Sequence, residues 1–456
     1  MPSSSQTQTF LNDIMSSIAE RGRALLGRSR PAIEQIDLVA IGELLLSRRG
    51  EASGVALAQT LLESYARAPL ALRLHFLTAL AERFGPDQKL LNKAVEDFRK
   101  DPEPAAARAL HNASEPRRQE LIRRLNLAPG GTFALVRMRE ELLDHLSARP
   151  DLKAVNEDFV HLFSSWFNRG FLVLRPIDWR TPANILEKII RYEAVHAIQD
   201  WNDLRNRLEP TDRRCFGFFH PQLVEEPLIF VEVALTTDIP GAIALLLAMD
   251  RTPIPAKEAT TAVFYSISNT QKGLGGVSFG NFLIKQVVED LKRELPNLRT
   301  FVTLSPVPGF AAWLARERAD ESSAFLTDVE KQGLRPLDEP GWHLDPATVE
   351  TVRRALMPAA AAYFLRAKTP RGRPIDPVAR FHLGNGARLE RINFLGDVSG
   401  KGLRQSHGLM VNYLYDLGHI EKNHEAFAEK GEVVASSTVR KTLRTDLPAR
   451  ELMPAP

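Results

Sequence analysis

Three segments of the sequence concentrate residue types that can do chemistry. The first, residues 264–281 (FYSISNTQKGLGGVSFGN), runs from a strand-like stretch through four glycines into a helix. Glycines let a backbone approach a ligand closely, and the N–H groups and dipole of a helix start favour an anion such as pyrophosphate. The spacing matches neither a Walker loop nor GxGxxG. A tight turn that binds nothing is the alternative.

The second segment, residues 303–310 (TLSPVPGF), places Ser305 between a strand and a helix. Because Ser305 precedes Pro306, one interpretation is that it only caps the helix that holds Trp313. The other is that it lies beside free N–H groups that stabilise an oxyanion. No GxSxG elbow surrounds Ser305, which argues against an α/β-hydrolase.

The third segment, residues 380–415, mixes polar residues and glycines with short apolar runs, as expected of a wall of a site. The eleven histidines show no HExxH pattern, so we expect no metal site. A lone histidine in such a segment is more often structural than chemical. The candidate residues of this wall are His382, Asn385, Gly386, Arg388, Arg391, Asn393, Asp397 and His407.

The elements that must position these segments form two groups. The first third of the chain reads as helices, with apolar residues at helical spacing and turn formers near residues 85–86, 101–104 and 129–131. One of these helices carries several arginines. No aromatic residues interleave with them, so we interpret them as a solvated face rather than a nucleic-acid surface. They are Arg117, Arg118, Arg123 and Arg124.

Beyond about residue 168, short apolar runs predict buried strands at residues 171–174, 228–235, 261–268 and 300–304. Thr181 and Pro182 predict a helix start, with Thr181 as the N-cap and Pro182 at the first helical position. Residues 282–295 predict an amphipathic helix. Strand, glycine turn, helix and strand then make a βαβ-like unit. We therefore predict an α+β protein, with an all-α helical domain at residues 1–165 and a mixed α/β domain at residues 166–456.

The composition is that of an ordinary globular protein, with 456 residues, 44% of them hydrophobic, and a net charge of +3. The one cysteine, Cys215, excludes an intrachain disulfide and fits a reducing compartment. No apolar run reaches the roughly 18–20 residues of a membrane span. Residues 10–26 resemble a mitochondrial presequence, but Asp13 and Glu20 argue against one. We predict a cytoplasmic protein with neither nucleic-acid nor membrane partners.

Together, the three segments resemble the malonyl-CoA decarboxylase family. The strings that carry the resemblance are FYSIS-TQKGL-GV, TLSPVPGF, FHLGNGA, ERINF, GDVS and GLMVNYLY. The resemblance implies a lyase that converts malonyl-CoA to acetyl-CoA and CO2 in malonate or fatty-acid metabolism. It also implies a helical domain used for self-association, as a dimer or tetramer, and a catalytic domain resembling the GNAT-type N-acetyltransferase fold.

The resemblance also implies roles for individual residues. Ser305 and His382 would be the catalytic pair, as proton acceptor and proton donor, and Tyr415 would line the substrate site. Thr270 stands where the CoA-binding turn of the fold, [RQ]xxGx[GA], has Arg or Gln. Malonyl-CoA binding would fall on Ser305, His382 and Tyr415 and on Gly275, Gly276, Val277, Ser278, Phe279, Gly280, Asn281 and Ile284.

The implied chemistry needs no cofactor, because the thioester carbonyl of the substrate accepts the electrons that CO2 leaves behind. The protein must orient the carboxylate, stabilise the enolate and protonate the carbon. We expect His382 to supply the proton because imidazole titrates near neutral pH. Two alternatives are an acetyltransferase, which requires an amine acceptor, and a non-catalytic CoA sensor, which leaves malonyl-CoA intact.

Overall fold

The computed structural model describes residues 37–47, 50–223, 225–277 and 283–444, so the predicted amphipathic segment at residues 10–26 lies outside it. By packing, the chain forms two compact units. The first comprises Met1–Val173, Phe219–Glu226 and Gln271–Phe279, and the second comprises the rest. None of the helices in the described ranges combines the length and apolar character of a membrane span.

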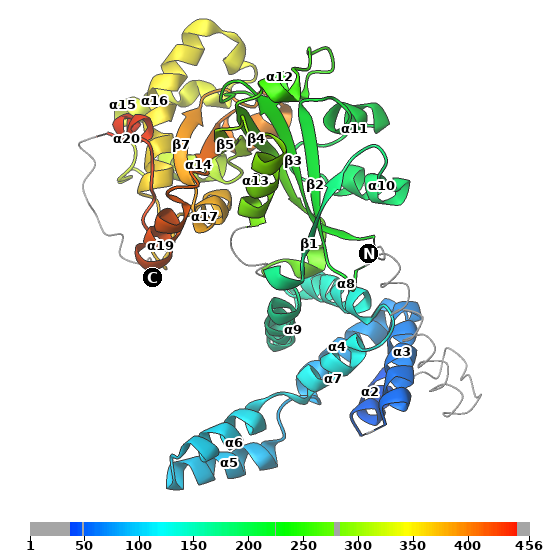
Figure 1. Ribbon diagram of the computed structural model, residues 1–456. Helices are drawn as coiled ribbons and strands as arrows, with labels where there is room; N and C mark the ends of the chain where they lie inside the picture. The colour runs from blue at the N-terminus through cyan, green and yellow to red at the C-terminus, as the bar shows by residue number, and fades with distance from the viewer. Residues whose placement is uncertain (1–36, 48–49, 224, 278–282, 445–456) are drawn as a thin grey trace. The chain divides into compact units, whose positions relative to one another are not determined.

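The first unit is helical, as the sequence predicts, and α5 and α6 lie side by side in it (Figure 1). The predicted breaks fall between α4 and α5, between α5 and α6, and between α7 and α8. Its α-helices are α2 (Leu38–Ser47), α3 (Glu51–Arg67), α4 (Leu70–Glu82), α5 (Gln88–Lys100), α6 (Pro104–Ser114), α7 (Arg117–Asn126), α8 (Gly131–His145) and α9 (Lys153–Trp166). Its 3₁₀ helices are η2 (Pro150–Leu152), η3 (Arg169–Phe171) and η5 (Lys272–Leu274).

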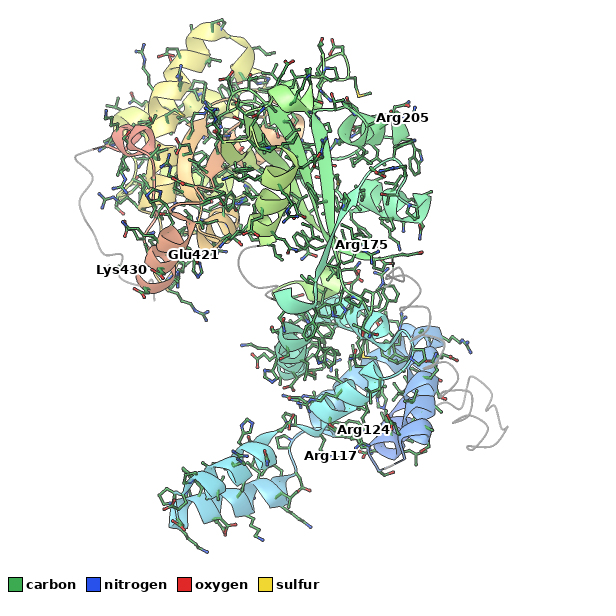
Figure 2. The ribbon with its side chains drawn as sticks, in the orientation of Figure 1. Arg117, Arg124, Arg175, Arg205, Glu421 and Lys430 are labelled. Atoms are coloured by element: carbon green, nitrogen blue, oxygen red, sulfur yellow. The ribbon has the colours of Figure 1, made fainter. Side chains whose placement is uncertain are left out.

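The arginines of α7 are paired with acidic side chains, and Figure 2 shows Arg117 and Arg124 on this helix. Arg117 contacts Glu43 at 2.5 Å, and Arg124 Nε donates to Glu120 at 2.8 Å. Arg118 departs from the predicted solvated face, because it is buried and pairs with Asp158 of α9. For Arg118 the prediction is therefore wrong.

The second unit contains an eight-stranded sheet in the order β1-β2-β3-β4-β5-β8-β6, with β7 also paired to β8. The predicted strand at residues 171–174 is shifted, since Phe171 belongs to η3 and is 54% exposed. β1 is an edge strand, which explains why Val173 is exposed as well. The strands are β1 (Val173–Ile177), β2 (Arg213–Phe219), β3 (Pro227–Thr236), β4 (Thr261–Asn269), β5 (Thr300–Thr303), β6 (Ser305–Pro306), β7 (Arg388–Asn393) and β8 (Met410–Leu414).

Helices of the second unit pack around this sheet, and α13 lies across it beside β4 and β5 (Figure 1). The predicted cap at Thr181 is wrong: α10 begins after Pro182, and Thr181 Oγ1 instead accepts the N–H of Asp178 at 3.0 Å. The helices are α10 (Ala183–Tyr192), α11 (Trp201–Leu208), α12 (Ala244–Leu247), α13 (Leu283–Glu294), α14 (Phe310–Ala319), α15 (Asp328–Gly333), α16 (Pro346–Leu365), α17 (Pro377–Gly384), α18 (Gly400–Ser406), α19 (Ile420–Lys430) and α20 (Ser437–Thr442), with 3₁₀ helices η4 (Ala256–Glu258), η6 (Arg335–Asp338) and η7 (Trp342–Leu344).

The centre of the sheet is the predicted βαβ-like unit. β4 and β5 are parallel and pair from Thr261↔Thr300 to Phe264↔Thr303. Beyond that pair β4 continues against β3, while Ser305 pairs with Val411 of β8. The two parallel strands therefore part just before Ser305. The α+β class is confirmed, and strand, glycine turn, helix and parallel strand is the arrangement expected of the GNAT-type fold.

Candidate active site

His382 is held at the end of a short, firmly capped helix. The side chain of Asp376 caps α17 by accepting the N–H of Ala379 at 2.7 Å, and Pro377 occupies the first turn. His382 lies in the last turn of this helix and is only 3% exposed. The ring of Tyr413 stacks on the imidazole, with centroids 4.6 Å apart. The imidazole is therefore fixed in position on its helix and on one face.

Ser305 and Tyr415 each form a hydrogen bond with one of the two ring nitrogens of His382. The Ser305 Oγ lies 3.1 Å from Nε2, and the Tyr415 hydroxyl lies 2.8 Å from Nδ1. Ser305 is in β6, while Tyr415 directly follows β8 and is anchored by its N–H to the carbonyl of Phe301. We refer to Ser305, His382 and Tyr415 as the Ser–His–Tyr network.

Ser305 does not cap the following helix, so that interpretation is wrong. α14 begins at Phe310 and its N-cap is Gly309, because Ser305 is drawn into the sheet by its pairing with Val411. The expectation that Ser305 lies beside free N–H groups that stabilise an oxyanion stays a prediction. Ser305 is a buried side chain at the point where β4 and β5 part.

Hydrogen-bond directions in the network follow from the single proton of each hydroxyl. Ser305 Oγ donates to Thr303 Oγ1 at 2.8 Å, and Thr303 Oγ1 also accepts the N–H of Tyr413 at 3.0 Å. With its proton engaged there, Ser305 accepts from Nε2 of His382. Nδ1 then accepts the hydroxyl proton of Tyr415. Each group therefore donates a hydrogen bond to the next: Tyr415 to His382, His382 to Ser305, and Ser305 to Thr303.

Burial keeps the network uncharged. It lowers the pKa of His382 to about 3 and raises the pKa of Tyr415 well above its usual value. The imidazole is therefore neutral at physiological pH, and the phenol keeps its proton. Our expectation that His382 titrates near neutral pH is wrong, because a fully buried imidazole with only neutral partners loses the solvation that its charged form needs.

Two predicted wall residues meet beside the network. Arg391 Nε and Asn393 Nδ2 both donate to Asn412 Oδ1, at 3.1 and 2.8 Å. Asn412 in turn donates to the Thr303 carbonyl at 2.7 Å, which ties β7 and β8 to the strand before Ser305. Asp397 and His407 instead flank α18, and within the described residues no hydrogen bond joins either to Ser305 or His382.

Thr303, Asn412 and Tyr413 are residues that the sequence analysis missed. A signal for two of them exists in the strand period of two, which places alternate residues on the same face. Thr303 is two residues before Ser305, and Tyr413 is two residues before Tyr415. Asn412 points to the other face of β8 and carried no such signal.

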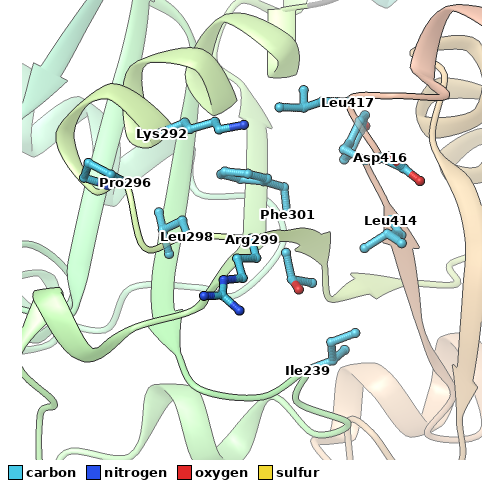
Figure 3. Close-up of a pocket in the computed structure, with 11 residues that line it drawn as sticks. Ile239, Lys292, Pro296, Leu298, Arg299, Phe301, Leu414, Asp416 and Leu417 are labelled. Carbon is cyan, nitrogen blue, oxygen red and sulfur yellow. The ribbon is translucent and has the colours of Figure 1, made fainter.

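Tyr415 also lines a pocket of about 610 Å³ in the second unit. Figure 3 shows Lys292 and Phe301 on one side of this pocket, and Leu414 and Asp416 on the other.

Among the described residues, no three His, Cys, Asp or Glu side chains gather in a way that could hold a metal ion. Because burial keeps His382 and Tyr415 neutral, the network can act through hydrogen bonds and proton transfer between neutral groups.

The predicted CoA-binding residues lie in the glycine turn (residues 271–277) and in α13. Gly275 and Gly276 are exposed, Val277 is buried, and Gly276 has a φ of +75°. Ile284 sits in the first turn of α13 with its side chain buried. Four further predicted residues, Ser278, Phe279, Gly280 and Asn281, lie outside the described residues.

Comparison with known proteins decides the family. The model of the malonyl-CoA decarboxylase C-terminal domain matches residues 170–453, and the model of the N-terminal domain of the same family matches residues 84–167. The chain belongs to the malonyl-CoA decarboxylase family. The predicted enzyme class, a carboxy-lyase, is thereby confirmed, and the resemblance of the three segments is confirmed with it.

Relatives and solved structures of this family resemble the chain over most of its length. The mitochondrial malonyl-CoA decarboxylase of Rattus norvegicus is 34% identical over 405 residues, which cover 82% of each chain. The crystal structure of malonyl-CoA decarboxylase from Rhodopseudomonas palustris is 65% identical, with a TM-score of 0.87 over 90% of this chain and 100% of that chain. The enzyme from Agrobacterium vitis is 61% identical, with a TM-score of 0.85 over 89% and 99%.

Proposed function

We propose that this enzyme converts malonyl-CoA to acetyl-CoA and CO2 through an enolate, with Ser305 and His382 as its catalytic residues. The bond between the α-carbon and the carboxylate breaks, and its electron pair moves onto the thioester oxygen. CO2 leaves, and the α-carbon then takes up one proton, which solvent ultimately supplies. The negative charge moves from carboxylate to enolate, so no external electron sink is needed.

The observation that supports this proposal is the buried, neutral Ser–His–Tyr network. An enolate carbon is a strong base, so a neutral imidazole N–H is acidic enough to protonate it. In our proposal, His382 donates its Nε2 proton, the hydroxyl of Tyr415 stays hydrogen-bonded to Nδ1, and solvent returns a proton to Nε2 once the products leave. In the resting enzyme Ser305 donates to Thr303 and accepts from Nε2 of His382. With substrate bound, we propose that the Ser305 hydroxyl donates to the substrate carboxylate instead of to Thr303, and that the Nε2–H of His382 turns from Ser305 to the α-carbon. Ser305 thus orients the group that leaves.

The CoA handle binds the glycine turn in this proposal. The exposed N–H of Gly276 would bind the pyrophosphate, and the exposed Gly275, which has no side chain, would let it approach closely. Ser278 to Asn281 are the further residues proposed for this contact. Ile284 would contribute its backbone N–H from the first turn of α13, because its side chain is buried in the core. Tyr415 would line the substrate site on the side of His382.

The direct test uses malonyl-CoA alone. Purified enzyme is dialysed against a chelator and mixed with malonyl-CoA without metal, cofactor or amine acceptor, and CO2 and acetyl-CoA are followed. We expect equal amounts of both products at the rate of untreated enzyme. An enzyme that stays inert until a metal ion, biotin or an amine is added would contradict the proposal.

The remaining proposals concern the oligomeric state, the cellular location and the metabolic role of the enzyme. We propose self-association through the helical first unit, as a dimer or tetramer, which light scattering on the purified chain tests directly. We also propose a cytoplasmic location, since the buried Cys215 is the one cysteine of the sequence. In that compartment the reaction would remove malonyl-CoA in malonate or fatty-acid metabolism. Cell fractionation with a mitochondrial marker distinguishes the locations.

A further inference from the structure

A buried arginine of α8 holds the backbone of the glycine turn. Arg139 is only 1% exposed, and its guanidinium donates to the carbonyls of Gly273 and Gly275 at 2.6 and 2.8 Å. Its Nε donates to Asn156 Oδ1 at 3.0 Å. All four residues belong to the first unit. A planar fork of fixed N–H groups thus clamps two carbonyls of the same turn.

The charge of Arg139 has no acidic partner among the described residues. Its hydrogen-bond acceptors are two backbone carbonyls and an amide, all of them neutral. Burial lowers the pKa of Arg139 only to about 10, so the guanidinium remains charged at neutral pH. An uncompensated buried charge costs free energy, which suggests that it serves an anion brought by a ligand.

The clamp also sets the direction of one backbone donor. In a trans peptide the C=O and the following N–H point in opposite directions. Because the Gly275 carbonyl is drawn toward Arg139, the N–H of Gly276 points away from α8. Gly276 is exposed, and no hydrogen bond to its N–H is present in the described part of the chain. The neighbouring N–H groups of Leu274 and Gly275 are already bonded within the turn.

Two further contacts hold the turn against α8. A Cβ added at Gly273 would lie 2.0 Å from the Val136 carbonyl oxygen, so only glycine allows this approach. Lys272 pairs with Asp144 at the end of the same helix. The turn is therefore supported by α8 along its length, and Arg139 is the buried centre of that support.

We propose that Arg139 is a positioning residue for CoA recognition: it fixes the glycine turn with the Gly276 N–H outward and places a positive charge behind the bound pyrophosphate. This inference rests on the proposed binding of CoA to the turn. It gives the helical first unit a second task beside self-association, because α8 then supports the binding of substrate.

The test compares malonyl-CoA with malonyl-pantetheine, which lacks the pyrophosphate. In the Arg139→Met enzyme we expect the KM for malonyl-CoA to rise at least about tenfold, with kcat within threefold, because a charge-assisted contribution is lost. The kcat/KM for malonyl-pantetheine should stay within twofold. Arg139→Lys keeps the positive charge but lacks the two fixed N–H donors of the guanidinium. Its KM for malonyl-CoA should therefore fall between those of the wild type and of Arg139→Met. Arg137→Met, at an exposed arginine of the same helix, is the matched control.

Three results of this experiment would contradict the proposed role of Arg139. If both substrates lose activity equally in Arg139→Met and Arg139→Lys, the residue only stabilises the fold and the inference is wrong. Unchanged KM in both variants contradicts it as well, provided that the wild type prefers malonyl-CoA. If the wild type itself shows no preference for malonyl-CoA over malonyl-pantetheine, the binding of CoA to the turn is wrong, and the role of Arg139 is wrong with it.

Discussion

In the described part of the glycine turn, the group available to a ligand is the backbone N–H of the exposed Gly276, and the charge behind it belongs to Arg139. In the Ser–His–Tyr network, the working groups are buried side chains, and burial keeps them neutral. The turn is held by a helix of the first unit, whereas strands and α17 of the second unit hold the network.

This difference follows from what each region must do. A dianionic handle is recognised best by a positive charge and by N–H groups that solvent can reach before binding. Loss of CO2 and protonation of the enolate require fixed hydrogen-bonding groups in a site from which water is excluded, which favours buried side chains that stay neutral. If the comparison is correct, substitutions in the two regions change different kinetic constants.

The largest effect is expected in the network. Ser305→Ala and His382→Ala should each lower kcat for malonyl-CoA at least about 100-fold, the low end for acid–base groups, because the proton path is broken. The KM should change less than about threefold. Steady-state kinetics, with circular dichroism as the control for folding, measure both. A variant that keeps near-wild-type turnover contradicts the assigned roles.

In the glycine turn we expect a smaller effect, and on KM rather than on kcat. Gly273→Ala adds a Cβ that meets the Val136 carbonyl, so the turn must move away from α8. We predict that the KM for malonyl-CoA rises about tenfold while kcat stays within threefold. The control is Gly85→Ala, where an added Cβ meets nothing within 4 Å. A fall of kcat without a rise of KM would show that the two regions are not separate in function.

The smallest effect separates two tyrosines of the network region. Tyr415→Phe removes the hydroxyl that bonds Nδ1 of His382, and we expect kcat to fall about fivefold, the value of one neutral hydrogen bond of about 1 kcal/mol. Tyr413→Phe removes a buried hydroxyl that has no hydrogen-bond partner among the described residues, so kcat should stay within twofold. Equal losses in both variants would mean that the hydroxyl of Tyr415 does not set the tautomer.

The sequence predicts the elements better than the side-chain environments. β3, β4 and α13 lie within two residues of their predicted bounds, because their apolar periods are long and bounded by turn formers. The edge strand β1 was misplaced, since its short apolar run is not buried. Local pattern therefore suffices where one face of an element is buried, and fails at the sheet edge.

The site itself required tertiary information. The resemblance brought Ser305, His382 and Tyr415 together, but nothing local shows that β8 pulls Ser305 out of the capping position. The neutral state of His382 also depends on burial between α17 and β8, which no spacing reveals. Arg139 was missed because an arginine in an amphipathic helix ordinarily faces solvent.

The neutral state of the network is the central claim, and the pH dependence of kcat/KM for malonyl-pantetheine tests it most directly. With a pKa of about 3, His382 does not change its charge between pH 5 and 8, so it contributes no limb in this range. Burial raises the pKa of Asp376 to about 6, and the Asp376→Asn enzyme, which keeps a helix cap, removes that titration. We predict a flat profile for this variant from pH 5 to 8. A rise or fall of kcat/KM with an apparent pKa between 6 and 7 would contradict the neutral state of the Ser–His–Tyr network.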